Sequence, residues 1–154
     1  MIIFRYRIAD VMVDPETSDP IFDITITDKP KDNVKTIFDD KTYTHTIPQN
    51  EIEKIKSIIS KNPELLEIKQ LEPNHEVLDG AIYEFIFSDG QKSTSFSGFN
   101  ILDYGRQPRK NATLALRTAR TIKDQVLLNH HIKTMIENRL QHWPKRHPRA
   151  IIKP

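Results

Sequence analysis

The six histidines come first for metal chemistry, because the chain has no cysteine to supply a thiolate. His130 and His131 are adjacent, so on a helix their side chains point about 100° apart and do not face one ion. His142 and His147 are separated by Pro144, which prevents a common helical face. The sequence therefore predicts no metal site, and no motif in it predicts a cofactor.

Serine and glycine residues also lack the arrangements that catalysis requires. Ser93, Ser95 and Ser97 alternate along one expected strand, without the GxSxG turn that exposes a nucleophilic serine. Residues 90–94 contain the last positions of a phosphate-binding loop, but the earlier glycine is absent and strand-like alternation follows. These patterns favour a protein that is not an enzyme.

The segment from Gly98 to Arg106 collects an aromatic ring, an amide, a carboxylate and a guanidinium before an expected helix. The N-terminus of a helix favours anions. If the chain has a small-ligand site, we expect it here, with Asn100, Tyr104 and Arg106 as the polar groups. The alternative is an ordinary connection from strand to helix.

Charge is distributed unevenly along the chain. Residues 1–105 contain 11 Lys+Arg and 19 Asp+Glu, whereas residues 106–154 contain 12 Lys+Arg and two acidic residues. One interpretation is nucleic-acid binding, with contacts from Arg109, Lys110, Arg117, Arg120, Lys145, Arg146 and Arg149. The others are a solvated surface and charge pairing with the acidic part of this chain or of a second copy. Charge pairing is favoured, because no known nucleic-acid-binding motif occurs in the sequence.

Strands are expected in the first two thirds of the chain. Alternating apolar residues predict strands within residues 2–13, 21–27, 34–47 and 83–101, with a turn at Asp39-Asp40 in the third segment. Asp89-Gly90 predicts a two-residue turn in the last segment, because type I′ turns need positive φ angles. That turn would set Tyr83 opposite Phe96 and Phe85 opposite Thr94.

Two helices complete the expected set. Asn50 as the N-cap and Glu53 three residues later predict a short helix that ends at Asn62-Pro63. The apolar face of this helix comprises Ile52, Ile55, Ile58 and Ile59. Residues 111–142 contain neither Gly nor Pro and predict a long helix.

The long helix presents two different apolar faces. In its first half, one face of the helix carries an apolar stripe formed by Ala112, Ala115, Ala119, Ile122 and Val126. Its second half presents a rotated face formed by Leu128, Ile132, Met135, Ile136 and Leu140. The helix either breaks at residues 129–131 or packs its second half on another surface, such as a partner subunit, so this face is a candidate dimer contact.

These patterns predict an α+β fold, with an antiparallel sheet of about five or six strands, a short middle helix and a long C-terminal helix. We expect one domain over residues 1–143 and a basic irregular tail over residues 144–154. With neither a signal-peptide pattern nor a membrane-spanning segment, the expectation is a cytoplasmic protein without membrane contact. The favoured function is a non-enzymatic domain that acts through protein–protein contacts as a homodimer. The alternative is a nucleic-acid-binding protein.

Overall fold

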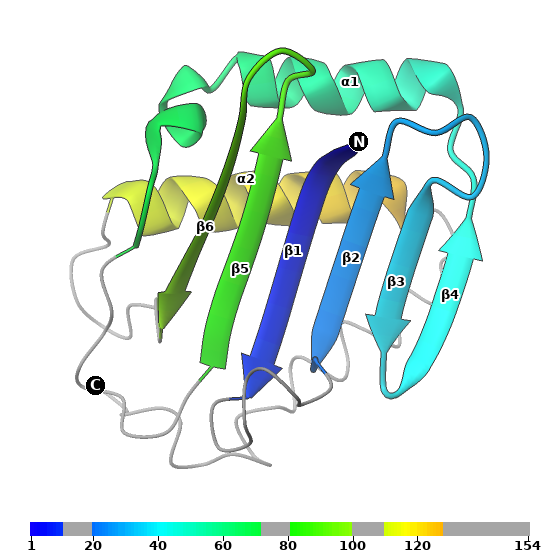
Figure 1. The fold of residues 1–154 in the computed structure, drawn as a ribbon, viewed down its shortest axis with the longest axis horizontal. Coiled ribbons are helices and arrows are strands. Elements are labelled where there is room, and N and C mark those ends of the chain that lie inside the picture. Colours follow the sequence, from blue (N-terminus) through cyan, green and yellow to red (C-terminus); the bar gives the residue numbers. More distant parts are fainter. Residues whose placement is uncertain (11–19, 72–80, 100–109, 128–154) are drawn as a thin grey trace.

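An antiparallel sheet of six strands carries two α-helices on one face (Figure 1). The computed structural model describes residues 1–10, 20–71, 81–99 and 110–127. The strands are β1 (Ile2–Asp10), β2 (Phe22–Thr27), β3 (Val34–Phe38), β4 (Lys41–His45), β5 (Ala81–Ser88) and β6 (Ser93–Phe99). The helices are α1 (Gln49–Ser60) and α2 (Lys110–Val126), with a 3-10 helix η1 (Pro63–Glu67). The expected α+β class is confirmed.

The strand order is β4-β3-β2-β1-β5-β6, so the first strand of the chain lies inside the sheet. The first four strands follow one another as neighbours, and the β5–β6 hairpin then pairs with the other side of β1. The register of β1 against β2 shifts between Ile2 and Phe4. This irregularity has the form of a β-bulge, and Ile3 and Phe4 are both fully buried there.

The predicted turn at Asp39-Asp40 is confirmed. Phe38 lies opposite Lys41, and the two aspartates between them have φ angles of 53° and 62°. A two-residue type I′ turn needs positive φ at both central positions, and aspartate tolerates that region better than most residues.

The turn predicted at Asp89-Gly90 is wrong by one position. The central residues are Gly90 and Gln91, because the N–H of Asp89 donates to the carbonyl of Lys92 at 3.1 Å. The carboxylate of Asp89 accepts the N–H groups of Gln91 and Lys92 at 2.8 and 2.7 Å, which fixes it before the turn. Only Gly90 has a positive φ, at 97°, as the first central position of a type II′ turn requires.

The β5–β6 register moves accordingly. Tyr83 lies opposite Gly98, and Phe85 opposite Phe96, so the predicted Tyr83–Phe96 and Phe85–Thr94 pairs are wrong. Each partner has moved by two positions, which keeps every side chain on its predicted face because strand side chains alternate with period two.

Helix α1 begins two residues before the position that the capping pattern predicted. Its N-cap is Pro48, which makes no side-chain hydrogen bond, so Asn50 lies within the first turn and the predicted cap is wrong. Gln49 donates its side-chain amide to Glu53 at 2.9 Å instead. The predicted apolar face is confirmed, with three isoleucines buried and Ile58 packed partly against the core.

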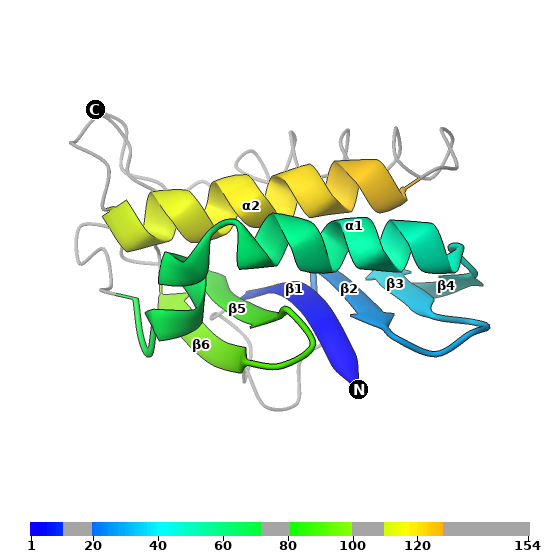
Figure 2. The same ribbon diagram turned by 90° about the horizontal axis from the view of Figure 1, so that it is seen from above.

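The core lies between the sheet and the two helices, which run side by side over one face (Figure 2). Aromatic rings from the central strands fill it: Phe85 stacks on Tyr6 at 5.5 Å and on Phe96 at 5.2 Å between ring centroids. Helix α2 contributes the predicted stripe, all of it buried: Ala112, Ala115, Ala119, Ile122 and Val126.

Candidate functional site

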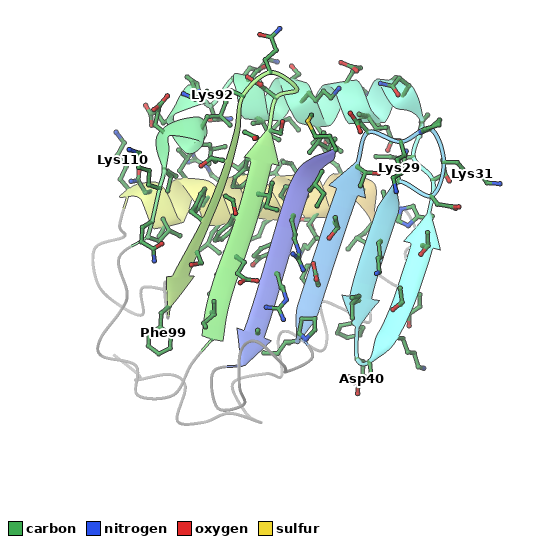
Figure 3. All side chains as sticks on the ribbon, viewed as in Figure 1. Lys29, Lys31, Asp40, Lys92, Phe99 and Lys110 are labelled. Carbon is green, nitrogen blue, oxygen red and sulfur yellow. The ribbon has the colours of Figure 1, made fainter. Side chains whose placement is uncertain are left out.

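The outward face of α2 carries two of the predicted basic residues, Lys110 and Arg117. Both side chains are exposed, on the side of the helix away from the buried alanines. Arg120 is exposed as well, but it also interacts with Tyr6 of the sheet, as described below. Figure 3 shows Lys110 at the start of α2, beyond the β6 edge of the sheet.

The remaining predicted site residues lie outside the described ranges and stay predictions. They are the basic residues Arg109, Lys145, Arg146 and Arg149, the ligand-site residues Asn100, Tyr104 and Arg106, and the dimer-face residues Leu128, Ile132, Met135, Ile136 and Leu140.

The cations of α2 have few acidic partners. Lys110 lies 3.9 Å from Glu64, and both side chains are largely exposed. The buried stem of Lys123 ends 3.6 Å from the carboxylate of the adjacent Asp124. Within the described ranges, Arg117 forms no ion pair. Among the described residues, the acidic part of the chain therefore supplies α2 with one weak contact, from Glu64, and no ion pair to Arg117.

Arg120 interacts with a buried hydroxyl of the sheet. Burial raises the pKa of Tyr6, and the guanidinium of Arg120 opposes that shift through its charge and a hydrogen bond. Arg120 thus contributes to the contact between α2 and β1, unlike Arg117.

The second face of the sheet, opposite α1 and α2, carries a network of charges. The guanidinium of Arg5 donates to both carboxylate oxygens of Asp23, at 3.2 and 2.8 Å. Arg7 donates to Glu84 at 3.0 Å and lies 3.9 Å from Asp23. The hydrogen bond with Asp23 raises the pKa of Arg5. Two arginines of β1 therefore occupy the carboxylates of β2 and β5, so these acids are not available to a basic helix.

Beside this network lies a shallow hollow of about 310 Å³. Its polar lining comes from Arg5, Lys69, Gln70, Glu84, Ser95 and Ser97. A serine nucleophile needs a base within hydrogen-bond reach. Of the six histidines, only His45 lies in the described ranges. It is on β4, at the other edge of the sheet from the serines of β6. Among the residues that the structure describes, the hollow therefore offers polar groups but no serine–histidine pair.

The two edges of the sheet differ. At the β6 edge, the N–H of Leu71 donates to the carbonyl of Ser97 at 3.2 Å, and the hydroxyl of Thr94 donates to the carbonyl of Ile68 at 2.7 Å. Lys92, labelled in Figure 3, pairs with Glu67 and lowers the pKa of that carboxyl. Residues 67–71 thus run alongside β6 and occupy part of its edge.

The β4 edge is free in the described structure. In a hairpin with a two-residue turn, the residues that flank the turn exchange both hydrogen bonds, and alternate positions point outward. Lys41, Tyr43 and His45 therefore direct their backbone groups to β3, whereas Thr42 and Thr44 direct theirs away. Both threonines are exposed, and no described residue bonds to those outward groups.

Neither the side chains of the described residues nor the comparisons with known proteins assign a function. The described residues include no group of three or more His, Asp or Glu side chains that could hold a metal ion. None of the described helices is long and apolar enough to cross a membrane. Comparison with protein-family models, curated proteins and solved structures found no match.

Sequence reasoning missed the charge network on the second face and the free edge. Arg5 and Arg7 alternate along β1, which was a visible signal, but their partners depend on strand pairing. Arg5 meets Asp23 through the pairing of β1 with β2, and Arg7 meets Glu84 through the pairing of β1 with β5 across more than 70 positions. The free edge depends on the strand order, which periodicity alone does not determine.

Proposed function

We propose that this chain is a non-enzymatic cytoplasmic domain that acts through protein–protein contacts and self-associates. The free edge of β4 is the observation that carries the proposal, because unpaired strand amides and carbonyls are a template for a further strand. The backbone groups of Thr42 and Thr44 would supply this contact.

Two other surfaces of the sheet, its second face and its β6 edge, already make contacts within the same chain, which leaves the β4 edge as the better place for a partner. The carboxylates of Asp23 and Glu84 on the second face are engaged by arginines of the same chain. The β6 edge is occupied in part by residues 67–71. By contrast, the outward N–H and C=O groups of β4 have no hydrogen-bond partner in the described structure.

The expected dimer is weak. Stable interfaces bury about 1,200–2,000 Å² in total, more than a pair of short edge strands supplies. We therefore expect a dissociation constant on the order of micromolar.

Sedimentation velocity and light scattering of the full chain over a concentration series test the proposal. Thr44→Pro removes an outward N–H without touching the hydrogen bonds to β3 and should abolish the dimer. Thr44→Val, the matched control, keeps the backbone donor and should dimerise like the parent chain. Circular dichroism and thermal unfolding check that both variants fold.

Two results would contradict this proposal in different ways. A chain that stays monomeric at about 100 µM and above has no self-association of the expected strength. A Thr44→Pro variant that is folded and still dimeric excludes the β4 edge. Loss of that dimer in Ile132→Glu would then assign the contact to the apolar face predicted in the C-terminal segment.

Nucleic-acid binding through the outward face of α2 is the second candidate. It is supported by Arg117, which is exposed and forms no ion pair within the described ranges, and by Lys110 on the same face. Anisotropy of labelled duplex DNA and structured RNA at ~50 and ~200 mM salt should show affinity falling about a thousandfold if six or more phosphates are contacted.

Charge reversal tests whether this face is responsible. Arg117→Glu should weaken binding, whereas Lys54→Glu on the exposed side of α1 makes the same charge change elsewhere. Equal loss in the two variants would indicate a nonspecific effect of net charge. No binding at the lower salt removes this candidate.

A further inference from the structure

The outward edge of β4 extends beyond the strand itself. Asn33 continues the ladder of β3 with its side chain: its Oδ1 accepts the N–H of Ile47 at 2.8 Å, and its Nδ2 donates to the carbonyl of Ile47 at 2.9 Å. Ile47 therefore directs its backbone groups toward β3, as His45 does. By alternation, Thr46 directs its backbone groups outward with Thr42 and Thr44.

The sequence of this edge is nearly symmetric about Thr44. Residues 42–46 read Thr-Tyr-Thr-His-Thr, with threonine at each outward position and an aromatic ring at each position between. In two-fold symmetric oligomers the same patch faces itself, so a symmetric strand can present equivalent groups to its copy. Thr42, Thr44 and Thr46 are all exposed.

We propose that β4 pairs with β4 of a second copy, antiparallel, about a two-fold axis at Thr44. This inference rests on the proposed self-association and specifies its register. Thr44 lies opposite Thr44 of the second copy, and Thr42 opposite Thr46. Every outward amide and carbonyl of the three threonines then has a partner, and the two sheets become one continuous sheet.

Side chains favour this register over its neighbour. Centring on Thr44 places Tyr43 opposite His45 of the second copy, and threonine opposite threonine, both favourable cross-strand pairs. Centring on Tyr43 would keep one aromatic pair and place Thr42 opposite Thr44, but it would place Lys41, not an aromatic ring, opposite His45. It would also leave Thr46 without a strand partner, because the turn residue Asp40 would face it.

The absence of cysteine from the chain makes disulfide trapping a direct test. Residues opposite each other in a hydrogen-bonded pair have Cα atoms about 5.5 Å apart, within the range of a disulfide. Thr44→Cys alone should form a covalent dimer under mild oxidation. Thr42→Cys alone should not, because its copies lie roughly 14 Å apart in this register.

The matched controls come from the same edge and the same face. Thr46→Cys alone should also stay uncrosslinked, whereas a mixture of Thr42→Cys and Thr46→Cys should form a heterodimer. We expect Thr44→Cys to crosslink at least about tenfold faster than Thr42→Cys at equal concentration. Light scattering on the reduced variants measures the noncovalent dimer in parallel.

The outcomes separate the register from the association. A dimer by light scattering in which Thr42→Cys or Tyr43→Cys crosslinks faster than Thr44→Cys overturns the register and leaves self-association standing. A noncovalent dimer with no crosslink at any β4 position excludes this edge. Reduced variants and parent that are all monomeric overturn both the register and the proposed function.

Discussion

The two faces of the sheet are built from the same strands but are held by different forces. Beneath α1 and α2, Tyr6 and Phe85 belong to a stacked aromatic cluster that excludes water. On the second face, Arg5 and Asp23 form ion pairs between strands that are in part exposed. Since apolar burial contributes more than exposed ion pairs do, the helix-covered face should carry most of the stability.

The largest predicted effect is on the helix-covered face. Phe85→Ala removes a ring that is 1% exposed and contacts other rings on both sides, so it should lower the free energy of unfolding by about 3–5 kcal/mol. Denaturant unfolding measures the loss. Ile86→Ala on the next residue, which faces the other way and is half-buried, is the matched control. Equal losses at the two positions would refute the comparison of faces.

A smaller effect is expected at the centre of the charge network. Asp23→Asn keeps the side-chain shape but turns an amide toward two arginines, so it should cost about 1–3 kcal/mol. Its side chain is only 6% exposed, which limits compensation by water. Glu84→Gln, at a side chain that is 41% exposed, should cost less than about 1 kcal/mol. Similar losses would mean that burial does not distinguish these carboxylates.

The smallest effect at neutral pH is expected from Tyr6→Phe. Tyr6 has a raised pKa in the folded state, so it contributes stability below its unfolded pKa of about 10 that is lost as the pH rises through the folded pKa. The phenylalanine variant should therefore lose less stability between pH 8 and pH 11 than the parent. Unfolding curves at both pH values give the difference, and parallel losses would show that Tyr6 does not titrate with folding.

Local patterns predicted the elements well because their signals lie within a few residues. The turn at Asp39-Asp40 and the buried stripe of α2 both follow from short-range geometry. The turn near Gly90 failed because the carboxylate of Asp89 holds two backbone N–H groups, a contact that a dipeptide pattern does not contain. Asn50 failed as a cap because α1 starts directly after Pro48.

The candidate surfaces were harder to predict than the elements. The basic face of α2 could be predicted because it needs only helical periodicity. The ion pairs of Arg7 with Glu84 and Asp23 need the pairing of β1 with β5 and with β2 at the correct register. The free edge at Thr44 needs the order of all six strands. Both features are set by contacts between distant segments.

The central position of β1 has a consequence for synthesis on the ribosome. β1 is synthesised before both of its partner strands. It can pair with β2 first, but its other edge has no partner until β5, which begins at Ala81, has been synthesised. At about 5–20 residues per second, the intervening segment takes roughly 4–14 s to emerge. Throughout that interval one edge of β1 has unpaired backbone amides and carbonyls, and Tyr6 lacks the ring of Phe85 that stacks on it in the folded protein. An exposed strand edge beside an apolar surface is the kind of surface that chaperones recognise.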